Sequence, residues 1–131
     1  MNFHIATEED RPDFPLKHFN DPLFDMDIFV AAWRLIKDYK GDYWDGATTE
    51  AGVPFMMLRD HPECVLIRPS TGEELIVDNV LAGMIMTHSV LLGRIRDGMS
   101  DLTKQHRDLK EALADYCIEL DRGDVLEALL H

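Results

Sequence analysis

The chain has 131 residues, of which 46% are hydrophobic, and its 25 acidic residues against 13 Lys and Arg give a formal net charge of -12. This length and composition suit one globular domain, residues 1–131, with an ordinary buried core. The negative charge repels phosphate backbones and anionic membrane surfaces, so we expect no direct nucleic-acid binding and no membrane binding. Such a charge suits a partner with a basic surface, although many plain cytosolic proteins are acidic too.

Cysteine usage and hydropathy indicate a cytoplasmic protein. Cys64 and Cys117 form no C-x-x-C motif, and we expect both to be reduced thiols. The first residues carry acids where a signal peptide has a basic region followed by an apolar stretch. The most apolar run, Val80 to Ile95, is shorter than the roughly 20 residues that a membrane span needs. That run predicts a buried core helix.

Residues 1–21 combine two prolines with five acids, which favours an irregular leader with Phe14, Leu16 and Phe19 as anchors onto the core. A helix is expected next, with Asp21 as its N-cap and Gly41 as its stop. Apolar residues recur at spacings of three and four along it and predict its buried face. They are Leu23, Met26, Phe29, Val30, Trp33, Ile36 and Tyr39.

From Tyr43 the pattern changes to short runs of strand-forming residues between turn residues. The expected strands are Tyr43–Trp44, Val53–Arg59, Cys64–Arg68 and Glu74–Val77. The short separations predict mainly antiparallel pairing, with a hairpin turn at residues 69–72. The predicted fold class is therefore α+β, a small, mainly antiparallel sheet of three or four strands with about four helices packed around it.

The C-terminal half predicts three helices. Asp78 or Asn79 caps the first, which runs to about Arg96 and is apolar nearly all round. Ser100 caps the next, which ends at Gly123. Its apolar face comprises Leu102, Leu109, Leu113, Tyr116 and Leu120. Residues 124–131 predict a short closing helix.

No catalytic, metal or cofactor motif is complete. His61 and Cys64 have the spacing of half a zinc site, but no second half follows, so we expect no metal. No glycine-rich phosphate loop occurs, and we expect no cofactor. His88 beside Ser89 lies outside any G-x-S-x-G motif. A small enzyme or ligand-binding domain using His88, Ser89 and Trp44 in one pocket stays as an alternative.

The candidates for binding a partner are four acids and one aromatic residue. Asp108, Glu111, Asp115 and Glu119 recur at three and four along one helix, opposite its leucines. They form either a solvated face paired with local cations or a carboxylate line that meets a basic surface and imitates the phosphates of DNA. Trp44 is equally consistent with a core anchor and with a binding rim.

Two motifs in fixed order resemble those of the ArdB/KlcA-type antirestriction proteins of plasmids, phages and genomic islands. The first is R-x-x-F-P-L-K-H-F at Arg11–Phe19, similar to F-L-P-R-H-F in that family. The second is D-Y-x-G-x-Y-W at Asp38–Trp44, similar to Y-x-G-G-Y-W. The match continues through Gly52 with Phe55-Met56, the helix from Asp78 to Leu91, Leu109–Tyr116 and Asp124–Leu130.

The resemblance implies a non-enzymatic protein of a mobile element that inhibits a host type I restriction-modification system by contacting a protein. The implied fold is a small mixed α/β domain. The motif residues have mainly structural roles in this interpretation. They are Phe14, Phe19, Tyr39, Gly41, Tyr43 and Trp44.

Overall fold

The computed structural model describes the backbone of residues 2–130 and the side chains of residues 2–128. Within this part of the chain the elements run in order β1 (Phe3–Ile5), η1 (Arg11–Asp13), α1 (Phe14–Phe19), α2 (Phe24–Leu35), β2 (Trp44–Thr49), β3 (Pro54–Leu58), β4 (Glu63–Ile67), β5 (Glu74–Asp78), α3 (Asn79–Arg96), η2 (Ser100–Leu102), α4 (Thr103–Glu119) and α5 (Gly123–Leu130). The η elements are 3-10 turns. The predicted α+β class is confirmed.

The strands form two small antiparallel sheets, where the sequence predicted one. One sheet has the order β1-β2-β3, and the other is the hairpin β4-β5. The chain leaves the first sheet after β3 because Asp60 adopts a left-handed conformation with φ of 69°. Pro62, which has no N–H to continue a ladder, follows just before β4. The predicted turn at residues 69–72 does close the β4-β5 hairpin.

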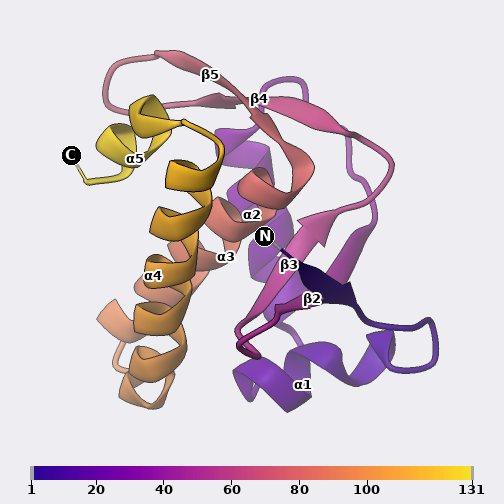
Figure 1. Cartoon of the computed structure of the whole chain (residues 1–131). Coiled ribbons are helices and arrows are strands. Elements are labelled where there is room, and N and C mark those ends of the chain that lie inside the picture. The colour runs from indigo at the N-terminus through magenta and orange to yellow at the C-terminus, as the bar shows by residue number, and fades with distance from the viewer. Residues whose placement is uncertain (1, 131) are drawn as a thin grey trace.

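Helix α3 is the centre of the molecule. It packs on β3 on one side and against α2 and α4 on others (Figure 1). The approach to β3 is so close that a Cβ at Gly83 would lie 2.0 Å from the carbonyl oxygen of Met56. Thr87 accepts a hydrogen bond from the Met56 N–H at 2.9 Å and donates one to the Gly83 carbonyl at 2.7 Å. The helix and the sheet are therefore joined by hydrogen bonds as well as by apolar packing.

The prediction of an irregular leader is wrong. Strand β1 pairs with β2, and α1 follows after the acidic turn at residues 8–10. Without β1, β2 would be an edge strand with unpaired backbone N–H and C=O groups, and such a strand is a template for a further strand. β1 supplies the hydrogen-bond partners for these groups. Phe14 and Phe19 are buried as expected, whereas Leu16 is exposed because it lies on the outer side of the short helix α1.

The predicted helix over residues 22–41 is too long at both ends. α2 begins at Phe24, and Asp21 accepts a hydrogen bond from the Leu23 N–H in the preceding turn. The helix ends at Leu35 because Ile36 is extended and pairs with Leu66 of β4. Gly41, with φ of 87°, turns the chain in the loop before β2 and does not cap the helix. Long-range strand pairing thus overrides the helical periodicity.

The predicted buried face is wrong for α2 and the turn before it, whereas Ile36 and Tyr39, which follow α2, are buried as predicted. Leu23, Met26, Phe29, Val30 and Trp33 are all exposed. The side of the helix that packs inward, on α1 and α3, instead carries Phe24, Ile28, Ala31 and Ala32. Both sides of α2 are apolar, so the periodicity alone did not determine which one faces the core.

The C-terminal helices follow the prediction with small changes. α3 has the expected bounds, and the Asp78 side chain caps it by accepting a hydrogen bond from the Leu81 N–H at 2.6 Å. Ser100 starts the 3-10 turn η2 and is not the cap of α4. Asp121, with φ of 56°, makes the turn after α4, so Gly123 is the first residue of α5. Leu120, expected in the core, is 38% exposed because it follows the last turn of α4.

Candidate functional site

The four acids predicted on one helix face line the same groove. This groove, of about 500 Å³, lies between α4 and the turn that joins β2 to β3. Asp108, Glu111, Asp115 and Glu119 come from α4, and Glu50 comes from the β2-β3 turn. Neither Lys nor Arg lines the groove within the described residues. The groove is therefore suited to cationic groups.

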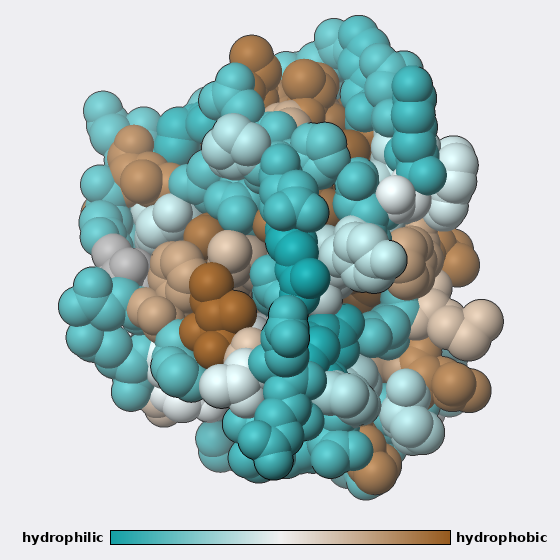
Figure 2. Space-filling model, turned by 90° about the vertical axis from the view of Figure 1, so that its right-hand side faces the viewer, coloured by the Kyte–Doolittle hydropathy of each residue, from teal (hydrophilic) through white to brown (hydrophobic). Residues whose placement is uncertain are grey.

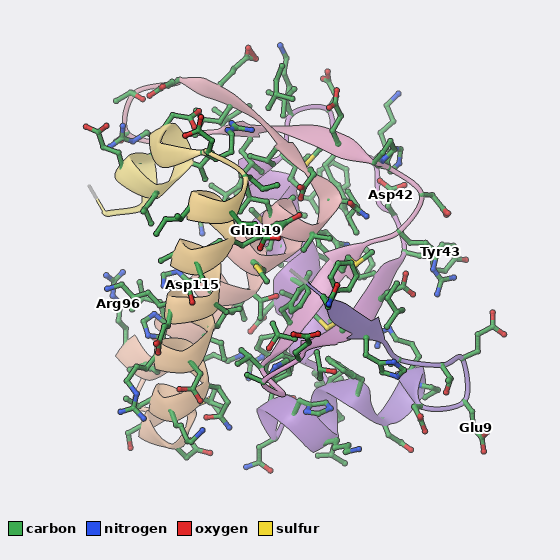
Figure 3. The ribbon with its side chains drawn as sticks, in the orientation of Figure 1. Glu9, Asp42, Tyr43, Arg96, Asp115 and Glu119 are labelled. Atoms are coloured by element: carbon green, nitrogen blue, oxygen red, sulfur yellow. The ribbon has the colours of Figure 1, made fainter. Side chains whose placement is uncertain are left out.

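Helical geometry positions the carboxylates. Residues three and four apart on an α-helix lie on the same face, so the four acids form a line along α4. Leu109, Leu113 and Tyr116 are buried and fix the rotation of α4 about its axis. Figure 3 shows Asp115 and Glu119 projecting from α4, one turn apart.

The carboxylates differ in their partners. Lys104 pairs with Asp108 at 2.6 Å, and its hydrogen bond is the main reason why the pKa of Asp108 is below the usual value. Asn2 donates a hydrogen bond to Glu50 at 2.8 Å. Glu111 and Asp115, in the middle of the line along α4, form no hydrogen bond or ion pair within the described residues. Asp108, at the end of the line, is therefore paired with a local cation, as the interpretation of these acids as a solvated face predicts.

Tyr116, which also lines the groove, connects it to the core. Its hydroxyl donates a hydrogen bond to Asp78 at 2.8 Å. Burial and this hydrogen bond raise the pKa of Tyr116. The same carboxylate caps α3, so Asp78 joins the groove wall of α4 to the N-terminus of α3.

Trp44 is a core anchor and not part of a binding rim. Its exposed fraction is 4%, and its indole Nε1 donates a hydrogen bond to the Tyr39 hydroxyl at 2.9 Å. Neighbouring side chains in an extended chain point to opposite sides, so Tyr43 faces solvent when Trp44 is buried. Tyr43 is 74% exposed, with the Arg59 guanidinium 5.7 Å from its ring centre. Of the motif residues predicted to have mainly structural roles, Tyr43 therefore does not anchor its strand in the core.

The alternative pocket with His88, Ser89 and Trp44 does not assemble. His88 and Ser89 line a mainly aliphatic cavity of about 240 Å³ between α3, the β4-β5 hairpin and α5, and Trp44 is not among its lining residues. The His88 ring packs against that of His106 in a tilted arrangement, with 4.5 Å between centroids and 32° between the ring planes. Burial, aided by His106 and Lys110, lowers the pKa of His88 to about 4. Ser89 forms no side-chain hydrogen bond to a base within the described residues.

The described residues contain neither a metal site nor a membrane-spanning helix. No group of three or more His, Cys, Asp or Glu is arranged there to hold a metal ion. His61 pairs with Asp42 at 3.0 Å, and Cys64 is a half-buried free thiol whose pKa burial raises to about 11. None of the described helices combines the length and the apolar character needed to cross a membrane.

No family model matches the chain, and no curated protein is significantly similar to it in sequence. The resemblance to antirestriction proteins therefore remains a hypothesis based on the quoted motifs. Of the motif residues, Phe14, Phe19, Tyr39 and Trp44 are buried in the core. One groove residue, Glu50, was missed by sequence reasoning because it lies far from α4 along the chain and meets it only in the folded protein.

Proposed function

We propose that the protein is a non-enzymatic antirestriction protein that inhibits a host type I restriction-modification system by binding a protein partner in the groove beside α4. The acidic groove carries this proposal, because it gathers five carboxylates and no lining Lys or Arg. Enzymes that bind DNA present Lys and Arg to the phosphates, and such a surface is complementary to this groove. The motif resemblance supplies the class of target.

The test in cells is a plating assay. Unmodified phage is plated on cells that carry a type I restriction system, with and without the protein. We expect the wild-type protein to restore plating while methylation stays intact. Unchanged plating with abundant, folded protein would contradict the proposed target.

The groove is tested by charge reversal. Glu111→Lys combined with Asp115→Lys changes the two unpaired groove acids, and we expect at least about tenfold weaker binding to the partner. Glu9→Lys combined with Asp13→Lys is the matched control, since it changes the net charge equally at exposed positions outside the groove. In the plating assay, the groove variant should no longer restore plating, whereas the control variant should. If both double variants fail to restore plating, or if both restore it, the groove is excluded as the specific binding surface.

Direct DNA mimicry is the second candidate, favoured by the line of carboxylates along α4. Successive turns of the helix place them about 5.4 Å apart along its axis. If the groove imitates phosphates, duplex DNA competes with the protein for the same partner, and the affinity falls with rising salt. Binding of the protein and duplex DNA to the partner at the same time would exclude mimicry and leave the antirestriction proposal intact.

A further inference from the structure

Helix α2 presents an apolar surface that no part of the described chain covers. The exposed fractions are 60% for Leu23, 60% for Met26, 38% for Phe29, 58% for Val30 and 62% for Trp33. In Figure 2, brown and tan side chains gather along the right-hand edge, the side of the molecule on which α2 lies. We call these five residues the α2 face.

The α2 face is large and firmly supported. Its side chains expose on the order of 500 Å², the size of the largest apolar patch on a typical monomer, and such patches are often functional. Trp33 rests edge-on against Tyr39 with 5.5 Å between ring centroids, and Phe29 lies 6.4 Å from the same ring. Tyr39 is buried, so the two exposed rings stand on the core. A partner would bind them with little loss of side-chain freedom.

The charges beside the α2 face are self-complementary. Asp27 and Arg34 are seven residues apart, which is about two helical turns, so both lie on the same flank of the apolar stripe. A two-fold axis between residues 30 and 31 would place a second α2 antiparallel to the first. This symmetry places the same flank of the two helices on the same side of the interface. Asp27 of each copy then lies opposite Arg34 of the other copy.

The two flanking charges are available for such a contact. Arg34 is exposed and forms no hydrogen bond or ion pair within the described residues. Asp27 uses one oxygen to pair with Arg94 at 2.6 Å, and its side chain is still 50% exposed. A hollow of about 170 Å³ follows this flank and is bordered by Val30, Arg34 and Asp97. The hollow holds a second carboxylate, that of Asp97, beside Arg94, whose guanidinium is already paired with Asp21 and Asp27.

We propose that the α2 face binds a second copy of this chain, forming a symmetric dimer through antiparallel α2 helices. In such an isologous interface each contact between two different residues occurs twice, so the Asp27–Arg34 pairing is formed once on each side of the axis. Val30 lies nearest the axis. The α2 face with its polar flank approaches the roughly 600 Å² per partner of the smaller stable interfaces, so we expect a dissociation constant of about micromolar order. This inference is independent of the acidic groove.

The mass in solution tests the dimer. Sedimentation equilibrium of the wild-type protein at concentrations around the expected dissociation constant should give twice the 15.0 kDa mass of the chain as its upper limit. Val30→Glu should hold the protein at the monomer mass. Ile118→Glu is the matched control, because Ile118 is an equally apolar side chain, 69% exposed, on α4. We expect this variant to dimerise normally, and circular dichroism verifies that both variants are folded.

Charge exchange tests the orientation of the two helices. Asp27→Arg alone and Arg34→Asp alone each place like charges opposite one another and should weaken the dimer several-fold, whereas the double variant restores the pairing. Arg94 keeps its second partner, Asp21, in these variants. A monomeric wild-type protein at several hundred micromolar would overturn the proposal. So would a dimer that Val30→Glu leaves intact, or single charge variants that the double variant does not rescue.

Discussion

Helices α2 and α3 are similarly apolar in sequence but differ in burial. α3 lies between β3, α2 and α4. Residues 80–87 are all buried, and Leu81, Met84 and Met86 among them have no exposed surface. α2 is covered on one side only and exposes Met26, Val30 and Trp33. The hydrophobic content of a helix therefore does not determine its burial, which depends on how many neighbours surround it. The surplus apolar side of α2 is a surface for association.

Truncation inside α3 should have the largest effect on stability. Leu81 has no exposed surface and contacts the centre of the core. We expect Leu81→Ala to lower the free energy of unfolding by about 3 kcal/mol, because it removes buried methyl groups and leaves a cavity. Urea unfolding followed by circular dichroism measures the change. A loss below about 1 kcal/mol would show that the core around α3 relaxes, which would weaken the contrast with α2.

The hydrogen bonds of Thr87 should have the next largest effect. Thr87→Val keeps the shape of the side chain but leaves the buried Met56 N–H without its acceptor. We expect a loss of about 2 kcal/mol in the free energy of unfolding. Thr87→Ser is the matched control, since it keeps the hydroxyl and removes one methyl group at a cost of about 1 kcal/mol. A serine variant less stable than the valine variant would contradict the role given to the hydroxyl.

Acid should destabilise the protein through His88, which packs between α3 and α4. Burial lowers the pKa of His88 from 6.5 to about 4, so the unfolded chain binds more protons than the folded protein between these values. Stability should therefore fall as pH drops from 6.5 toward 4. His88→Gln should make this fall shallower in urea unfolding at a series of pH values. An unchanged slope would exclude His88 as a contributor; part of the slope should remain because burial also lowers the pKa of His106.

Truncation on the α2 face should have the smallest effect on the stability of the monomer. Leu23 is 60% exposed, and we expect Leu23→Ala to change the free energy of unfolding by less than about 0.5 kcal/mol in dilute protein. At high protein concentration the wild type gains stability from dimerisation, and the variant should gain less. The difference between the two concentrations isolates the α2 face. A large loss in dilute protein would show that Leu23 supports the fold of the monomer itself.

Local signals predicted much of the fold. The bounds of α3, the strands β3 to β5 and the line of acids on α4 follow from capping residues, turn residues and side-chain periodicity. Each of these signals acts within a few residues along the chain. The candidate site was predicted in part for the same reason, since its four α4 acids belong to one helix face.

The tertiary structure decided what depends on distant segments. Ile36 leaves the helical path because it pairs with Leu66, and the leader orders because β1 pairs with β2. Glu50 joins the acids of α4 only after the β2-β3 turn packs beside that helix. The orientation of α2 was undetermined because both of its sides are apolar, and the core it meets is assembled from residues far apart in sequence. Local sequence thus determined α3, the strands β3 to β5 and the line of acids on α4. Long-range packing decided the order of the leader, the end of α2 and which side of α2 is buried, because burial requires a partner surface that no local pattern encodes.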